Sequence, residues 1–421
     1  MQALQGKLIR LTQLIRTSLN ILFREGIPAF VERLYRWLKG ERRFYHPPAP
    51  RNPLYELLSP EMNILLISHD LRLGGASVLL YHVAVFLRRA GYYVTVASPT
   101  ADTLKAELER AGVPVVIEPA FLSDPQQVQP WIGTFDLVVA NTLLNWASVN
   151  AAASAGRPVM WMIHEPAEWL KTLLQWPEEA AQAFRRANAI VYSARNILWA
   201  YKAFAEQGWH TTACYGIPDP LIEAEGIPSP CRREEGKLYL AHVGTIEPRK
   251  APDILLHSLK QLPAPLLEQI EVYFVGYPVY PAYLQVLKDM AQGYAGIHFV
   301  GEGNPRDSLG YIKEADILVS TSRQETGPLV VLEAMGLGKT VITTRVGMME
   351  EVIRHGSNGY LINVDDVEEL TAILSHLARN RLLLRRVGQA ARRKYEEALT
   401  LDRYGRDLLQ IMGQMLRRIH A

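Results

Sequence analysis

The chain has 421 residues, of which 48% are hydrophobic and 21% charged, and its formal net charge is +2 at pH 7. This length exceeds one ordinary core and predicts two domains with extensions, while the apolar content excludes a disordered chain. The near-neutral charge gives no reason to expect nucleic acid as a partner. Two cysteines, Cys214 and Cys231, are too few for a disulfide framework or a zinc site, so a reducing, cytoplasmic location is expected.

The first sixty residues are basic. They carry ten Lys and Arg side chains against four Glu, a net charge of +6 that leaves −4 over the remainder. Apolar residues recur at helical spacing over 7–38, and the prolines of 47–53 indicate a tether. Two interpretations stay open: residues 1–45 lie on anionic lipid at the inner face of a membrane, or they form a packing extension or linker. No run reaches the ~18–20 apolar residues of a membrane-spanning helix.

From residue 61 onward, short apolar runs alternate with helical patterns. A Gly74-Gly75 turn precedes a helix predicted over Val78–Ala90, and a second helix is predicted over 102–111. The predicted strands are Ile64–Ile67, Tyr92–Ala97, Val113–Ile117, Leu137–Ala140, Val159–Ile163 and Ala189–Tyr192. Apolar strands separated by helices indicate a parallel sheet that is covered on both faces.

Glycine and proline interrupt this alternation at 216–236, which reads as an interdomain linker. A second alternation follows, with strands predicted at Leu238–Val243, Val272–Val275, Ile297–Val300, Ile317–Ser320, Thr340–Thr343 and Tyr360–Ile362. The predicted fold class is α/β, with two doubly wound, Rossmann-like domains that face each other across a cleft. The expected segments are a helical extension and tether (1–60), a first Rossmann-like domain (61–216), a linker (217–236), a second Rossmann-like domain (237–395) and a C-terminal helix packing back on the first domain (396–421).

Two glutamates flank a predicted helix start in the second domain. Pro328 suits a first turn, so the helix should begin near Leu329 and stop at Gly336-Leu-Gly338. Glu325 then precedes the helix, and Glu333 lies roughly 6 Å inside it. The helix amides between them form an anion site. A ligand with hydroxyls at both ends and phosphate in the middle, such as a nucleotide sugar, suits this layout. The alternative is that both acids only complement the helix dipole or are solvated.

Three further candidate sites follow predicted strands. Gly74-Gly75 allows a close backbone approach to substrate, although tight turns also use glycine for steric reasons alone. His164 ends the strand Val159–Ile163, which places it at the predicted cleft, whereas a lone histidine is more often structural. Arg249 and Lys250 share a loop after Leu238–Val243 and could neutralise a diphosphate, although paired surface cations are ordinary.

Some expected signatures are missing from the sequence. It contains no Asp-x-Asp pair for a metal-bound diphosphate and no phosphate loop of the Gly-x-x-x-x-Gly-Lys type. It also contains no serine-centred nucleophile elbow. We therefore expect no metal and no cofactor, and expect cationic side chains and the helix N-terminus to stabilise a leaving diphosphate.

Over about residues 62–395 the chain resembles the retaining GT-B glycosyltransferases of family 4. The resemblance is strongest over Ala241–Asp253 and Ala315–Asn363, which contain the Glu325-x7-Glu333 pair, Glu351-Val-Ile and Asn358-Gly-Tyr-Leu. It implies that the first domain (61–216) binds the acceptor and the second (237–395) the nucleotide-sugar donor. It also implies that Glu325 holds donor-sugar hydroxyls and Glu333 the ribose hydroxyls. Lys250, helped by Arg249, would bind phosphate, His164 would lie at the reaction centre, and Gly75 would lie near acceptor and phosphate. The same resemblance implies that the backbone amides of Gly327, Leu329 and Val330 contact the sugar and phosphate.

The chain departs from the family pattern in four places. Thr245 follows Gly244 where many members have arginine, and Arg249 is the candidate substitute. Thr340 replaces a common proline, Gly347-Met348 replaces Gly-Gly, and Tyr215-Gly216 replaces Asn-Gly at the linker. None of these changes touches the two glutamates.

The leading hypothesis is therefore a metal-independent, retaining glycosyltransferase that uses a UDP- or GDP-sugar. Its acceptor would be a lipid-linked, polysaccharide or other glycan in bacterial cell-surface synthesis. With no candidate for a covalent nucleophile, the resemblance favours front-side attack, with the leaving phosphate assisting deprotonation of the acceptor. Two alternatives stay open, a nucleotide-sugar epimerase of the same fold and a donor-binding subunit that has lost catalysis.

Overall fold

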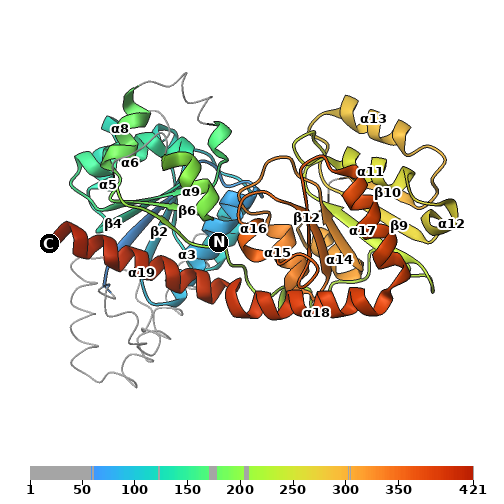
Figure 1. The fold of residues 1–421 in the computed structure, drawn as a ribbon. Coiled ribbons are helices and arrows are strands. Elements are labelled where there is room, and N and C mark those ends of the chain that lie inside the picture. Colours follow the sequence, from blue (N-terminus) through green and yellow to red (C-terminus); the bar gives the residue numbers. More distant parts are fainter. Residues whose placement is uncertain are drawn as a thin grey trace, which may run out of the picture.

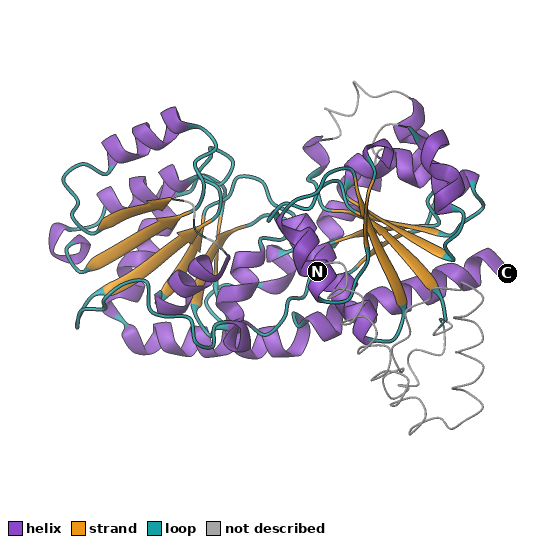
Figure 2. Ribbon diagram, turned by 180° about the vertical axis from the view of Figure 1, so that it is seen from behind, coloured by secondary structure: helices purple, strands orange, loops and turns teal. Residues whose placement is uncertain are grey.

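The computed structural model describes residue 58 and residues 61–121, 124–169, 178–202, 208–301, 303 and 305–420. Two parallel sheets lie side by side in separate domains, and helices cover both faces of each sheet (Figures 1 and 2). The predicted fold class is thereby confirmed for these residues. The helical extension predicted over 1–60 lies outside them, apart from Leu58. Within the described part of the chain, no helix is both long and apolar enough to cross a membrane.

The first sheet has the strand order β3-β2-β1-β4-β5-β6-β7, with every pair parallel. Its order reverses between β1 and β4, the point at which doubly wound sheets bind ligands. The strands are β1 (Asn63–Ile67), β2 (Tyr93–Ser98), β3 (Val115–Ile117), β4 (Leu137–Asn141), β5 (Val159–Ile163), β6 (Ala189–Tyr192) and β7 (His210–Thr212). The helices with it are α3 (Gly75–Arg89), α4 (Thr103–Arg110), α5 (Pro125–Ile132), α6 (Trp146–Ser154), α8 (Glu178–Arg186) and α9 (Arg195–Lys202), with single 3-10 turns at Pro119–Phe121, Leu143–Asn145 and Ala167–Trp169.

The second sheet has the order β10-β9-β8-β11-β12-β13, again parallel throughout, and its order reverses between β8 and β11. The strands are β8 (Leu238–Val243), β9 (Ile270–Val275), β10 (Ile297–Gly301), β11 (Ile317–Ser320), β12 (Thr340–Thr344) and β13 (Tyr360–Ile362). The helices are α10 (Pro220–Glu223), α11 (Pro252–Lys260), α12 (Ala264–Leu267), α13 (Pro281–Met290), α14 (Pro305–Glu314), α15 (Leu329–Gly336), α16 (Met349–Val352), α17 (Val367–Arg379), α18 (Arg381–Ala398) and α19 (Leu401–His420).

The chain crosses between the domains twice, and the two crossings lie together. Ile217 in the linker donates its amide to Leu399 O, and Leu401 returns an amide to Ile217 O, at 3.0 and 2.8 Å. A Cβ on Gly216 would overlap the carbonyl of Thr400, so glycine permits this close approach. After the second crossing, α19 runs along the first domain and packs against α3 (Figure 1).

Buried apolar side chains join the two domains into one continuous core. A single cluster contains Leu66 of β1, Leu332 of α15 and Met412 of α19, all fully buried. A second cluster lies on the other face of the second sheet and includes Leu256, Ile342 and Leu374. Because the shared core and the paired crossings hold the domains together, the strand ends of the two sheets meet in a defined arrangement.

Candidate functional site

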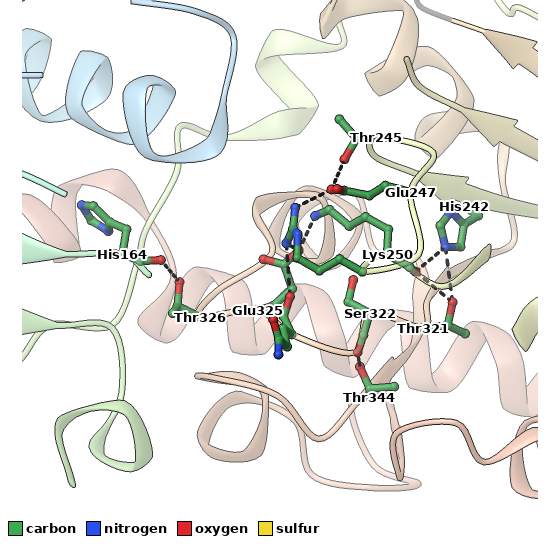
Figure 3. Close-up of polar contacts among 12 residues, drawn as sticks. His164, His242, Thr245, Glu247, Lys250, Thr321, Ser322, Glu325, Thr326 and Thr344 are labelled. Atoms are coloured by element: carbon green, nitrogen blue, oxygen red, sulfur yellow. Dashed lines mark hydrogen bonds and ion pairs between the residues drawn. The ribbon is translucent and has the colours of Figure 1, made fainter. Parts of the chain in front are cut away.

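The loop between β11 and α15 carries the first of the paired glutamates. Thr321 Oγ1, on the loop, donates to Ala251 O at 2.6 Å. Thr344 Oγ1 donates to Ser322 O at 2.6 Å (Figure 3). These bonds anchor the loop to two neighbouring segments. Pro328 precedes the helix, which runs over Leu329–Gly336 and is followed by Gly338 with a φ of +70°. The predicted start and stop of this helix are both confirmed.

Glu325 is held by the two cations that the sequence placed on a different loop. Lys250 Nζ and Arg249 Nη1 both approach Glu325 Oε1, the second at 3.1 Å, and the Glu325 side chain is only 13% exposed (Figure 3). Arg249 also pairs with Glu247 at 2.7 Å. The two positive and two negative charges balance, so an arriving anion has to displace a carboxylate contact to reach Lys250.

Close backbone contacts shape the loop that carries these cations. Gly244 follows β8 with a φ of +144°, and its carbonyl would overlap a Cβ on Gly276 after β9. Thr245 does not extend towards Glu325; its hydroxyl donates to Glu247 at 2.7 Å, and Glu247 in turn holds Arg249. Thr245 stands where many family members have arginine, and here it donates to Glu247, the carboxylate that also binds Arg249.

Glu333 has a different environment from Glu325. It is partly buried on α15, and no hydrogen bond or ion pair joins its carboxylate to another of the described residues. Burial raises the pKa of Glu333 to about 7, and the like charge of Glu223 adds to that shift. Leu329 and Val330, in the first turn of the same helix, are also partly exposed.

His164 directly follows β5, as predicted. Its backbone contacts the loop between β11 and α15 (residues 321–328), called the donor-side loop below. Its carbonyl oxygen accepts a hydrogen bond from Thr326 Oγ1 at 2.7 Å, next to Glu325 (Figure 3). Both ring nitrogens are engaged, Nδ1 with the Tyr215 hydroxyl at 2.5 Å and Nε2 with Asn141 Oδ1 at 2.6 Å. Burial lowers the pKa of His164 to about 3, with the charge of His69 as a smaller cause. The imidazole is therefore neutral at physiological pH.

The candidate glycines of the Gly74-Gly75 turn and Gly327 have opposite surroundings. Gly74 caps α3 and Gly75 opens it, and a Cβ on either would meet no atom within 4 Å. Neither packing nor a positive φ demands glycine there, which leaves close approach of a ligand as a reason for it. Gly327 is different, because a Cβ there would lie 2.5 Å from the Tyr215 ring and 2.6 Å from Met348 Sδ. Gly327 is required by packing against the linker.

Several site residues were not identified from the sequence. Asn141, at the end of β4, joins His164 to the glycine turn, because its Nδ2 donates to Ala76 O at 3.0 Å. Glu165 is buried and accepts the amides of Leu143 and His164, both at 3.0 Å, while burial raises its pKa to about 7. Only the strand-end position could have indicated these residues.

Thr142 is strained at the same edge of the sheet. Its φ and ψ are 75° and 158°, a region that non-glycine residues rarely occupy and that costs about 1–3 kcal/mol. The residue is buried, and its hydroxyl has no partner among the described residues. Backbone strain of this kind gathers at functional sites. The strained residue lies between Asn141, which contacts His164, and Leu143, which contacts Glu165.

The structure thus brings most of the predicted site residues together. His164, Glu325, Arg249 and Lys250 meet directly or through Thr326, and Gly75 is linked through Ala76 and Asn141. Glu333 lies on α15, directly after this loop, and its carboxylate has no hydrogen bond or ion pair with these residues. Across the described residues, no group of three His, Cys, Asp or Glu side chains is placed to hold a metal ion. The individual roles of these residues stay predictions.

Two family models match the chain, one in each domain. Residues 61–187 match the model described as "Glycosyl-transferase family 4", and residues 227–394 match "Glycosyl transferases group 1". Among curated proteins, the sulfoquinovosyl transferase SQD2 of Arabidopsis thaliana is 30% identical over 177 residues, 39% of this chain and 31% of that protein. A D-inositol 3-phosphate glycosyltransferase of Geodermatophilus obscurus is 30% identical over 179 residues, 40% of this chain and 38% of that protein. The chain thus matches about a third of the length of these relatives.

Solved structures share the two-domain fold. HepE of Anabaena, solved with UDP-glucose, superposes with a TM-score of 0.70 at 20% identity, covering 84% of this chain and 100% of that one. Sucrose-phosphate synthase of Thermosynechococcus elongatus gives a TM-score of 0.68 at 18% identity, covering 86% of this chain and 99% of that one. At these identities the likeness shows the fold.

Proposed function

The chain belongs to glycosyltransferase family 4 and has the GT-B fold, and from this we propose that it transfers a sugar with retention of configuration from a nucleotide-diphosphate sugar to a glycan or lipid-linked acceptor. One observation supports this most strongly. Lys250 and Arg249 converge on Glu325 directly before the start of α15, and the carbonyl of His164 from the other domain is hydrogen-bonded to the adjacent Thr326. Cations, a carboxylate and helix amides thus surround one point between the domains, which suits a sugar diphosphate.

A bound donor would rearrange these charges. The diphosphate takes the place of Glu325 as the partner of Lys250, and the released carboxylate accepts hydrogen bonds from hydroxyls of the transferred sugar. The amides of the first turn, at Leu329 and Val330, face phosphate and sugar, and Glu333 accepts from the ribose hydroxyls. Because HepE was solved with UDP-glucose, a UDP-sugar is the first donor to test and a GDP-sugar the second.

The proposed reaction is a front-side displacement. The bond from the anomeric carbon to the diphosphate oxygen breaks, and the acceptor oxygen bonds to that carbon on the same face. The proton of the acceptor hydroxyl passes to the departing phosphate oxygen. Lys250, Arg249 and the start of α15 stabilise the negative charge that develops on the diphosphate. His164 stays neutral throughout, in keeping with its lowered pKa.

The proposal includes an acceptor and a location. The acceptor would be a lipid-linked or polysaccharide glycan of the bacterial cell surface, bound by the first domain. The chain would act in the cytoplasm, and residues 1–45 would contact anionic lipid at the inner face of the membrane. Binding to vesicles of phosphatidylcholine with phosphatidylglycerol, before and after deletion of residues 1–45, tests the lipid contact. Equal binding by both proteins would contradict it.

The reaction type is tested with a panel of UDP-, GDP- and ADP-sugars. Release of the nucleoside diphosphate is measured, and the anomeric configuration of the first-formed product is read by proton NMR. We expect turnover of one donor, a retained anomer and an unchanged rate in EDTA. An inverted anomer, or a rate that EDTA abolishes and a divalent cation restores, would contradict these details. An epimerised nucleotide sugar without diphosphate release would indicate an epimerase, and binding without turnover would indicate a silent donor-binding subunit.

A further inference from the structure

Tyr215 contacts site residues from both domains. It lies on the interdomain linker, is 4% exposed, and packs edge-on against Tyr404 of α19 with a centroid distance of 6.0 Å. Gly327, beside Glu325, has no room for a side chain because the Tyr215 ring fills that space. The Tyr215 hydroxyl reaches His164 Nδ1 at 2.5 Å. One linker residue therefore contacts the C-terminal helix, the donor-side loop and the histidine of the first domain.

In each hydrogen bond of the series from Ala76 to Tyr215, the donor and the acceptor can be assigned in only one way. Ala76 O can only accept, so the Asn141 amide must present its Nδ2 to that carbonyl and its Oδ1 to the histidine. His164 Nε2 then carries a proton and donates to Asn141 Oδ1. Nδ1 is left as an acceptor, and it receives the Tyr215 hydroxyl proton. The backbone of the glycine turn thus determines the tautomer of His164, and Tyr215 completes the chain at its other end.

From this geometry we propose that Tyr215 is a positioning residue: by donating to Nδ1 it supports the Nε2–H tautomer of His164 that Asn141 sets, and it keeps the ring in place beside the donor-side loop. The proposal rests on the proposed function of the same site. Removing the hydroxyl leaves the buried Nδ1 without a donor, and this unsatisfied acceptor allows the ring to turn. Thr326, which donates to the His164 carbonyl, also forms a hydrogen bond with the Tyr215 side chain. Loss of the Tyr215 hydroxyl therefore also alters the contact between the first domain and the loop that carries Glu325.

The sequence alone offers no reason to assign this role. Tyr215 stands where the family resemblance places asparagine and is one of the chain's departures from the family pattern. Asparagine is shorter and carries no ring, so the packing against Gly327 and Tyr404 requires an aromatic side chain. Ser193 and Thr326 also interact with the Tyr215 side chain, which places the phenol among polar groups from both domains.

The test compares Tyr215→Phe with Tyr395→Phe. Tyr395 is a matched control because it is equally buried, at 1% exposed, and its hydroxyl donates to Ile217 O at 3.0 Å on the same linker, away from His164. Both variants keep the ring, and their melting temperatures are measured first. Proteins labelled with nitrogen-15 histidine report the His164 ring, whose signals are identified by their absence in His164→Gln.

In Tyr215→Phe we expect the His164 Nδ1 resonance to move towards that of a nitrogen without a hydrogen bond. We also expect kcat for the preferred nucleotide sugar to fall about 10- to 100-fold, with the donor KM changed by less than about threefold. Tyr395→Phe should leave both readouts at wild-type values. Unchanged His164 signals in Tyr215→Phe, or an equal loss of kcat in Tyr395→Phe, would overturn the proposal. If the wild type turns over no nucleotide sugar, the proposed function fails, and the nitrogen signals still decide whether Tyr215 fixes His164.

Discussion

Glu325 and Glu333 are eight positions apart, and their carboxylates have opposite surroundings. Glu325 is paired with Lys250 and Arg249, whereas Glu333 is partly buried without a partner among the described residues. The pKa of Glu333 is raised to about 7, chiefly by burial and then by Glu223. Near neutral pH this carboxyl is therefore divided between its protonated and ionised forms, so the second glutamate is the one whose state changes in the physiological range.

This raised pKa predicts pH-dependent donor binding. An ionised carboxylate accepts hydrogen bonds from hydroxyls more strongly than a neutral carboxyl does. Donor binding therefore favours deprotonated Glu333, and affinity should increase as pH rises from 6 to 8, by about three- to tenfold. Calorimetric titration with the preferred nucleotide sugar measures the effect. Glu333→Gln should bind more weakly, with that part of the pH dependence removed. Identical profiles for the two proteins would contradict a role for Glu333 at the donor.

Individual site residues were predictable where a local motif carried them. Glu325, Arg249, Lys250 and His164 follow strands, and parallel strands end at one edge of a sheet, so their proximity could be expected. Thr142 and Tyr215 could not be found in this way. The strain of Thr142 exists only in the folded backbone, and the role of Tyr215 depends on contacts with residues 51 and 189 positions away, His164 and Tyr404.

At the scale of elements, one glycine lies where two helices pack against each other, and another lies where a helix borders the site. Gly405 lies on α19 where that helix crosses α3, and a Cβ there would overlap the ring of Phe86. Gly75 opens α3 into space that no described atom fills. The first glycine therefore serves packing, and the second is available to a ligand.

Alanine at these two glycines should give opposite results. Gly405→Ala forces α19 away from α3 and should lower the free energy of unfolding by about 1–3 kcal/mol. Gly75→Ala should leave the unfolding free energy within about 0.5 kcal/mol of the wild type. It should nevertheless reduce kcat/KM about tenfold, because the methyl group enters the space proposed for substrate. Urea unfolding and the transfer assay separate the two effects. A Gly75→Ala protein as unstable as Gly405→Ala would show that Gly75 serves the fold.

Most strands could be predicted because they are short apolar runs, many of them buried on both faces. β1 and β8 are nearly continuous apolar runs, and they were located to within one residue. β7 (His210–Thr212) was missed, because it is a three-residue edge strand of half-buried polar side chains and lacks that signal. The start of α15 was predicted correctly because Pro328 restricts where a helix can begin.

At the scale of the whole molecule, the loops around the site join the two domains. Ser193 Oγ after β6 donates to Thr326 O at 2.9 Å, and Asn196 Nδ2 donates to Gly347 O at 2.8 Å. A Cβ on Gly347 would overlap Thr326 O, so the loop after β12 lies directly against the donor-side loop. Contacts between segments more than 130 positions apart could not be read from a sequence. They explain why His164 and Glu325 meet at one point.

The central claim is that Lys250 and Glu325 hold the sugar diphosphate of a glycosyl donor. The most direct measurement is the rate of nucleoside diphosphate release from the preferred nucleotide sugar by the wild type, Lys250→Ala, Glu325→Gln and the control Lys105→Ala. Lys105 is a control because its ion pair, with Glu109 on α4 at 2.8 Å, is exposed and involves no site residue. We expect kcat to fall about 10²- to 10³-fold in each of the two site variants, since each loses a group that stabilises the reacting charges, and to stay unchanged in Lys105→Ala. Undiminished turnover in both site variants would contradict the assignment.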